Sequence, residues 1–186
     1  MKKLFFLGIL TSVLLFSCSK EKEDTIKAIV DEKNNIVTYN DVVFGLSTED
    51  EKYGRFFSFE SGKIYKASEI DETNGSTIHL AFGNFSKAMF FFESPTAKGY
   101  NIPNATETKI INYEKEPSIS VDDFDSMTDD RKLAALTIEG KGDDSFGYSS
   151  IPGTVLFEIS TGQKGVIKTK SLNSDRLLVD IKIQKN

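Results

Sequence analysis

The side chains that could carry nucleophilic or metal chemistry are few, because the 186-residue chain holds one cysteine, Cys18, and one histidine, His79. A zinc site needs several His or Cys ligands, which this chain lacks. No Gly-rich phosphate loop and no G-x-S-x-G nucleophile motif occurs. A Ser-His-Asp triad would have to use His79, which we expect inside a strand. The sequence therefore predicts a protein that is not an enzyme and holds no cofactor.

Carboxylates are the remaining reactive groups, with 28 Asp and Glu residues. No two of them are set apart as the acid and base of a glycosidase, so an enzyme ranks behind a binding or structural protein. The acidic runs at 122–125, 129–130 and 143–144 offer oxygen ligands for calcium, but none has the D-x-D-x-D-G spacing. Acids at helix starts explain the first two runs, and the third lies in a glycine-containing loop. We expect no metal site.

The first 18 residues have the features of a lipoprotein export signal. Lys2 and Lys3 precede an apolar run at 4–16, which is shorter than the roughly 20 residues that span a bilayer as a helix. The run ends in Leu-Phe-Ser-Cys, which resembles a bacterial lipobox whose cysteine receives acyl chains such as palmitate. We therefore expect residues 1–17 to be removed and Cys18 to attach the protein to a membrane through lipid.

Residues 18–34 are expected to form a charged tether. The segment 19–24, Ser-Lys-Glu-Lys-Glu-Asp, resembles the signal that carries Bacteroidota lipoproteins to the outer face of the outer membrane. We expect a surface-exposed position there, with a periplasm-facing protein or a plain hydrophilic spacer as the alternatives. Removing 1–17 takes away two lysines and leaves 21 basic against 28 acidic residues, a net charge of −7. This acidic balance argues against nucleic acid as a partner.

Residues 35–186 are expected to form a single β-rich domain. Alternating apolar residues or short β-branched and aromatic runs predict strands at 36–39, 42–46, 55–59, 78–82, 87–93, 110–111, 155–159, 166–172 and 177–183. Short turns join the last three of these, without the long helical crossovers that parallel strands need. The predicted fold is all-β, an antiparallel β-sandwich-like domain with two short helical insertions.

The two insertions carry helix signals. The spacing of Ser68 and Asp71 resembles a capping box, and we expect about two helical turns there. Ser120 and Asp123 repeat the box, and Thr128 is expected to begin a further helical stretch with acids first and bases later.

The final strand is expected to bury one face only. Val179, Ile181 and Ile183 alternate with Asp180 and Lys182. A charge at Ile181 should cost several kcal/mol of stability, whereas Lys182→Asp on the opposite face should cost little.

Four segments resemble a family of small Bacteroidota surface lipoproteins without assigned activity. They lie at 57–65, 78–83, 124–130 and 178–185, and the resemblance covers roughly residues 40 to 185. It carries no catalytic signature and implies an outer-membrane lipoprotein.

A more distant likeness runs to the haem-capturing lipoproteins of the same phylum, whose all-β fold holds haem between two axial side chains. That likeness would make His79 one ligand, with Met89, Met127 or a tyrosine opposite it. Such proteins often use two histidines and this chain has one, so we expect no bis-histidine haem site.

The candidate ligand-binding residues are His79, Met89, Tyr100 and Tyr148, the tyrosines because they lie near loops and could stack on a sugar. The many phenylalanines are expected in the core. The triplets that begin at Asp24 and Asp125 resemble Bacteroidota O-glycosylation acceptors, with Thr25 and Ser126 as the modified residues.

The function that the sequence favours is a non-catalytic, outer-membrane-anchored accessory that binds a ligand or a protein or glycan partner. A structural or interaction protein of the cell surface with no small-molecule ligand is the alternative, and a haem- or glycan-binding module is third. A deep apolar cleft with convergent polar groups would favour the binding function.

Overall fold

The structure, a computed structural model, describes residues 26–31, 34–46, 52–86, 88–140 and 144–186. Three of the predicted features lie outside the described residues: the signal peptide at 1–17, the lipidation residue Cys18 and the glycosylation candidate Thr25. Asp143 of the third acidic run also lies outside them. Within the described part of the chain, no helix is both long enough and apolar enough to cross a membrane.

Six strands form the larger sheet, in the order β1-β2-β10-β9-β8-β7, and all neighbours in it are antiparallel. The expected meander at the end of the chain is confirmed, because β8, β9 and β10 are neighbours in sequence and in the sheet. The strands are β1 (Ala28–Asp31), β2 (Ile36–Gly45), β7 (Thr108–Ile111), β8 (Thr154–Ile159), β9 (Lys164–Leu172) and β10 (Arg176–Gln184).

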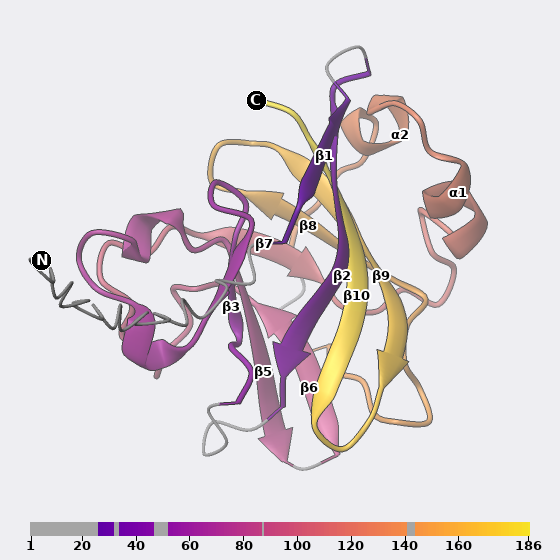
Figure 1. Cartoon of the computed structure of the whole chain (residues 1–186). Coiled ribbons are helices and arrows are strands. Elements are labelled where there is room, and N and C mark those ends of the chain that lie inside the picture. Colours follow the sequence, from indigo (N-terminus) through magenta and orange to yellow (C-terminus); the bar gives the residue numbers. More distant parts are fainter. Residues whose placement is uncertain (1–25, 32–33, 47–51, 87, 141–143) are drawn as a thin grey trace, which may run out of the picture.

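Four strands form the smaller sheet, in the antiparallel order β4-β3-β5-β6 (Figure 1). They are β3 (Phe56–Ser58), β4 (Lys63–Tyr65), β5 (Leu80–Ser86) and β6 (Met89–Glu93). One core cluster holds side chains of both sheets, so the sheets pack face to face. The predicted antiparallel β-sandwich is confirmed.

The main core lies between the sheets and is rich in phenylalanine, as expected. Phe44 of β2 contacts three rings of the smaller sheet, with ring centroids 6.3 Å from Phe57, 5.8 Å from Phe82 and 5.2 Å from Phe92. All four side chains are at most 1% exposed. Burial of a side chain of this size is worth about 1.5–3 kcal/mol, so these rings hold the two sheets together.

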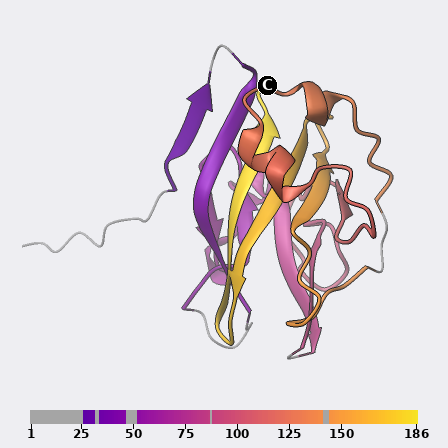
Figure 2. The ribbon, with the colours of Figure 1, turned by 90° about the vertical axis from the view of Figure 1, so that its right-hand side faces the viewer.

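Two α-helices cover the outer face of the larger sheet, α1 (Val121–Ser126) and α2 (Arg131–Ala134), and Figure 2 shows them over β9 and β10. The expected capping box of α1 is confirmed. Ser120 Oγ accepts from the Asp123 N–H at 3.1 Å, and the Asp123 carboxylate accepts from the Ser120 N–H at 3.1 Å. The second helix begins three residues later than Thr128, the expected start.

The segment at 68–74 does not form the helix of about two turns that its capping signal predicted. Two 3-10 turns occur instead, η1 (Ala67–Glu69) and η2 (Gly75–Thr77). Asp71 Oδ1 accepts from the Thr73 N–H at 2.8 Å, and Asn74 Oδ1 accepts from the Asp71 N–H at 2.9 Å. Short polar side chains that bond the neighbouring backbone in this way compete with a helix, so the chain turns here.

The last strand is covered on both faces, fully on one and partly on the other, which corrects one expectation. Ile181 is fully buried, as predicted, but Asp180 is only 6% exposed. Lys182 Nζ donates to the carbonyl oxygens of Phe124 at 2.7 Å and Met127 at 2.8 Å. The prediction that Lys182 faces solvent is wrong, because α1 lies over it.

The larger sheet begins earlier than the domain boundary expected at residue 35. Strand β1 lies inside the segment 18–34, yet it pairs with β2 from Ala28 opposite Tyr39 to Asp31 opposite Ile36. This early strand forms one wall of a cleft.

Candidate functional site

A cleft of about 520 Å³ opens at the end of the sandwich where β1, the β3–β4 turn, the β8–β9 turn and the end of β10 meet. Pockets for small molecules usually measure about 300–1,000 Å³. The apolar lining residues are Ile26, Ala28, Val30, Val37, Phe59, Ile159 and Ile183. The polar side chains that line it are Lys27, Tyr39, Glu60, Ser61, His79, Thr161, Gln163, Gln184, Lys185 and Asn186.

The wall formed by β1 is held by β2 along one edge and by the β3–β4 turn at its start. Alternate residues of an extended chain face the same way, so Ile26, Ala28 and Val30 all turn toward the cleft. The Ile26 N–H donates to the Gly62 carbonyl at 3.0 Å, which joins the start of this strand to the β3–β4 turn. Gly62 has φ +61°, and a Cβ there would lie 2.8 Å from the Ile26 carbonyl oxygen. Glycine is required for this contact.

His79 is the one candidate from the sequence that lines the cleft. Its backbone is held on both sides, since its N–H donates to the Phe57 carbonyl at 2.9 Å and its carbonyl accepts from Thr108 Oγ1 at 2.6 Å. Ring atom Nδ1 accepts from the Phe59 N–H at 3.2 Å. Burial lowers the pKa of His79 to about 4. The ring is therefore neutral at pH 7, with its proton on Nε2 as a hydrogen-bond donor.

Aromatic rings form the base of the cleft beside His79. Phe59 stacks on Phe157 with centroids 5.2 Å apart and lies 5.4 Å from the His79 ring. Tyr39 Oη donates to the Phe59 carbonyl at 2.6 Å. Burial raises the pKa of Tyr39 to about 12, so the phenol stays protonated. The contacts with neighbouring rings fix the position of Phe59 in the lining of the cleft.

The opposite rim is held by amide hydrogen bonds. Gln163 Nε2 in the β8–β9 turn donates to the Gln184 carbonyl at 2.7 Å, and the Lys164 N–H donates to Gln184 Oε1 at 3.0 Å. Thr161 Oγ1 donates to Gln163 Oε1 at 2.8 Å. Both walls are thus tied to the larger sheet by hydrogen bonds of the protein itself.

The structure does not bring Met89 toward His79. His79 directly precedes β5, whereas Met89 pairs with Ser86 at the far end of that strand. Six residues separate Leu80 from Ser86, or roughly 20 Å at about 3.3 Å per residue. Met127 lies in the other core cluster, beneath α1. Neither methionine can therefore face His79 as a second haem ligand, so the residues present do not fit a haem bound between His79 and a methionine.

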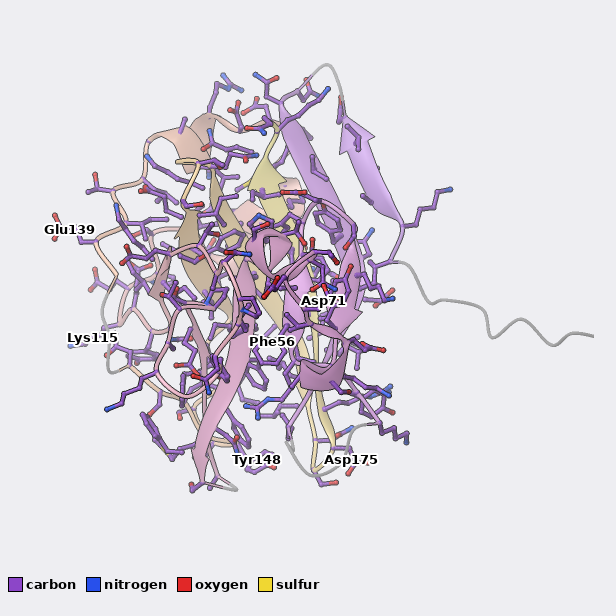
Figure 3. All side chains as sticks on the ribbon, turned by 90° about the vertical axis from the view of Figure 1, so that its left-hand side faces the viewer. Phe56, Asp71, Lys115, Glu139, Tyr148 and Asp175 are labelled. Carbon is purple, nitrogen blue, oxygen red and sulfur yellow. The ribbon has the colours of Figure 1, made fainter. Side chains whose placement is uncertain are left out.

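The remaining candidates lie in separate places. Tyr100 packs edge-on against Phe56 at 5.0 Å, and its hydroxyl donates to Glu93 on the outer face of the smaller sheet. Tyr148 is 45% exposed, and Figure 3 shows it at the lower end of the molecule. Ser126 is exposed, with Oγ donating to the Asp122 carbonyl at 2.7 Å. Among the described residues, no three His, Cys, Asp or Glu side chains are grouped to hold a metal ion.

Two sets of polar or lining residues were not predicted from the sequence. The first is the cleft wall at 26–30, whose alternating Ile, Ala and Val were the available signal. The second is Arg55, which is 6% exposed and donates from Nε to the Phe82 carbonyl at 2.6 Å and from Nη2 to Asn84 Oδ1 at 3.2 Å. Burial lowers the pKa of Arg55 and raises that of nearby Glu93. No sequence signal marked this buried charge.

Comparison with known proteins gives a fold and no activity. No protein-family profile and no curated protein matches the chain. A solved structure with a similar fold is a DUF4466 family protein from Parabacteroides merdae, with a TM-score of 0.54 and 13% sequence identity. The match covers 82% of this chain and 55% of that protein, so this chain spans about half its length. At this identity the likeness shows the fold alone.

Proposed function

We propose that the protein is a lipid-anchored, non-catalytic accessory of the bacterial outer membrane that binds a small, mainly apolar molecule in the cleft beside His79. The observation that carries the proposal is the cleft itself, with its volume of about 520 Å³, apolar walls and a buried neutral imidazole. A protein with a purely structural role has no need of such a cleft, so binding is favoured over the structural alternative.

The lining defines the chemistry of the ligand. Burial of apolar surface is worth about 25 cal/mol per Å², which the aliphatic walls would supply. Because His79 is neutral and Nδ1 is already bonded to Phe59, the ring can offer only its Nε2–H. A matching ligand carries an uncharged acceptor, such as a carbonyl, ether or hydroxyl oxygen, next to an apolar body.

The anchoring part of the proposal rests on the sequence around Cys18 and on the charged residues that follow it. A fold similar to that of a Parabacteroides protein supports a Bacteroidota origin for this architecture. Attachment to the outer membrane would expose the cleft to small apolar molecules from outside the cell.

The test is a titration of the purified protein with an uncharged, environment-sensitive apolar dye such as N-phenyl-1-naphthylamine. We expect one saturable site whose dissociation constant rises at least about tenfold in Ala28→Phe, because the added ring fills the cleft. Ile29→Phe adds the same ring on the other side of β1 and should change the constant less than about twofold. Both titrations are repeated with Phe85→Ser, which removes a 75% exposed ring that could also attract the dye. Equal binding by the Ala28 and Ile29 variants would place the dye elsewhere and refute the proposal.

A further inference from the structure

The outer edge of β1 differs from the outer edge of β6, an edge strand of the other sheet. Phe92 of β6 bonds Asn112 through both its N–H and its carbonyl, each at 2.7 Å. The backbone N–H and carbonyl of Phe90 likewise bond the carbonyl and N–H of Phe146, each at 2.8 Å. Side chain and loop thus cover the edge of β6. Within the described residues, the backbone of Ala28–Val30 bonds β2 and no other segment.

The edge of β1 also carries apolar side chains in contact with solvent. Ile29 is 56% exposed and Val30 is 48% exposed. No bulge interrupts the β1–β2 register, and the strand contains no proline. Proteins usually protect such edges with prolines, bulges or charges that point inward. β1 is protected only by its short length and by the charges of Lys27 and Asp31 at its ends. Its β-branched residues Ile29 and Val30 suit it to pairing with a strand whose charges match.

The charges around β1 select the partner strand. Lys27 stands directly before β1, Asp31 ends it, and Ile29 lies midway between them. In an antiparallel pair of two such strands centred on Ile29, each Lys27 stands opposite Asp31 of the second copy. Opposite charges at facing positions stabilise a pair of strands, and like charges destabilise it. The strand is therefore complementary to itself.

We infer that two copies of this chain associate through β1, in an antiparallel, two-fold symmetric pair with Ile29 opposite Ile29 of the second copy. The larger sheet then continues from one copy into the other. On the cleft side, Ala28 stands opposite Val30 of the second copy, so the two clefts open next to each other. This inference rests on the strand and its charges and does not depend on what the cleft binds.

A pair of four-residue strands makes a small interface, which is typical of transient association, so covalent trapping is the suitable readout. In cells that produce the full chain, Ile29→Cys should give a disulfide-linked homodimer on mild oxidation, because facing residues of antiparallel strands lie about 4.5–5.5 Å apart. Phe85→Cys, at the more exposed end of β5, measures random collision, and the unaltered chain measures any contribution of Cys18. We expect at least about fivefold more homodimer from Ile29→Cys than from either control. Equal yields, or a disulfide to a different protein without homodimer, would overturn the inference.

Charge reversal tests the register in the same assay. Added to Ile29→Cys, either Lys27→Asp or Asp31→Lys places like charges opposite each other at both ends of the pair, and we expect the homodimer yield to fall to the collision level. Co-production of the two reversed chains restores opposite charges and should restore a mixed dimer. Both side chains are exposed, but Asp31 also accepts from Asn34 Nδ2 at 2.7 Å. Circular dichroism of each reversed chain therefore checks that the fold is kept. If the yields do not respond to reversal, the proposed register is wrong.

Discussion

The protonation of His79 should couple to folding in the pH range just below neutrality. Its pKa is about 4 in the folded protein and about 6.5 in an unfolded chain, so the unfolded state binds more protons between these pH values. Above pH 6.5 the ring is neutral in both states, and its burial does not lower the free energy of unfolding. As the pH falls toward 4, the free energy of unfolding decreases by about 3 kcal/mol.

We expect His79→Gln, which does not titrate, to lose less stability than the natural protein between pH 7 and pH 4. Denaturant unfolding at several pH values measures the difference. The carboxylates titrate in both proteins and therefore cancel in the comparison. Parallel pH profiles for the two proteins would contradict the assigned burial of the ring.

The sequence predicted His79 inside a strand, whereas His79 directly precedes β5. The sequence also could not show the surroundings of this residue. Its ring partner Phe59 is 20 positions away, and the cleft also needs Ile26, Gln163 and Gln184. Periodicity tells which side chains share a face of a strand, but it does not tell which turns close over the end of a sheet. Residue type was the basis for the candidates Tyr100, Tyr148 and Met89. Residue type does not give a position in the fold, and the structure places these residues outside the lining of the cleft.

At the scale of secondary-structure elements, Lys182 joins α1 to the larger sheet. Its ammonium group satisfies two backbone carbonyls at the end of α1 and lies 4.8 Å from the centre of the Phe124 ring. Burial lowers the pKa of Lys182. We expect Lys182→Met to cost about 1–3 kcal/mol in the free energy of unfolding, because these carbonyls lose their donor.

Lys109→Met is the matched control for Lys182→Met. Lys109 also donates at 2.8 Å, to Glu158, but its side chain is half exposed, so its loss should cost less than about 1 kcal/mol. Chemical denaturation of both variants measures the two values. Equal costs would mean that α1 does not depend on Lys182.

The local helix signals succeeded where tertiary packing agreed with them. The box at Ser120 became a real cap because Phe124, one turn later, is buried against the sheet. The similar signal at Ser68 failed because η1 buries no side chain, while Asp71 and Asn74 bond the neighbouring backbone. Without an apolar face to bury, a short helix has little to stabilise it.

At the scale of the whole molecule, the sandwich follows from the alternation that the sequence shows. The proposed attachment to a membrane depends on residues that precede the described part. We expect Cys18→Ala to abolish acylation and to release the protein from the membrane fraction. Ser19→Ala, which keeps the cysteine, should behave like the natural protein. Metabolic labelling with a fatty-acid analogue, followed by fractionation, measures both. Label on the Cys18→Ala protein would contradict a lipid anchor at this residue.

The central claim, a ligand cleft beside His79, has a direct spectroscopic test because the chain contains a single histidine. Protein labelled with ¹³C and ¹⁵N at histidine, and carrying no polyhistidine tag, gives ring signals that need no assignment. We expect the Nε2 signal to shift saturably as the apolar dye is added, with the dissociation constant found by fluorescence, and to stay unchanged in Ala28→Phe. A dye that saturates its fluorescence while the His79 signals remain still would contradict the claim.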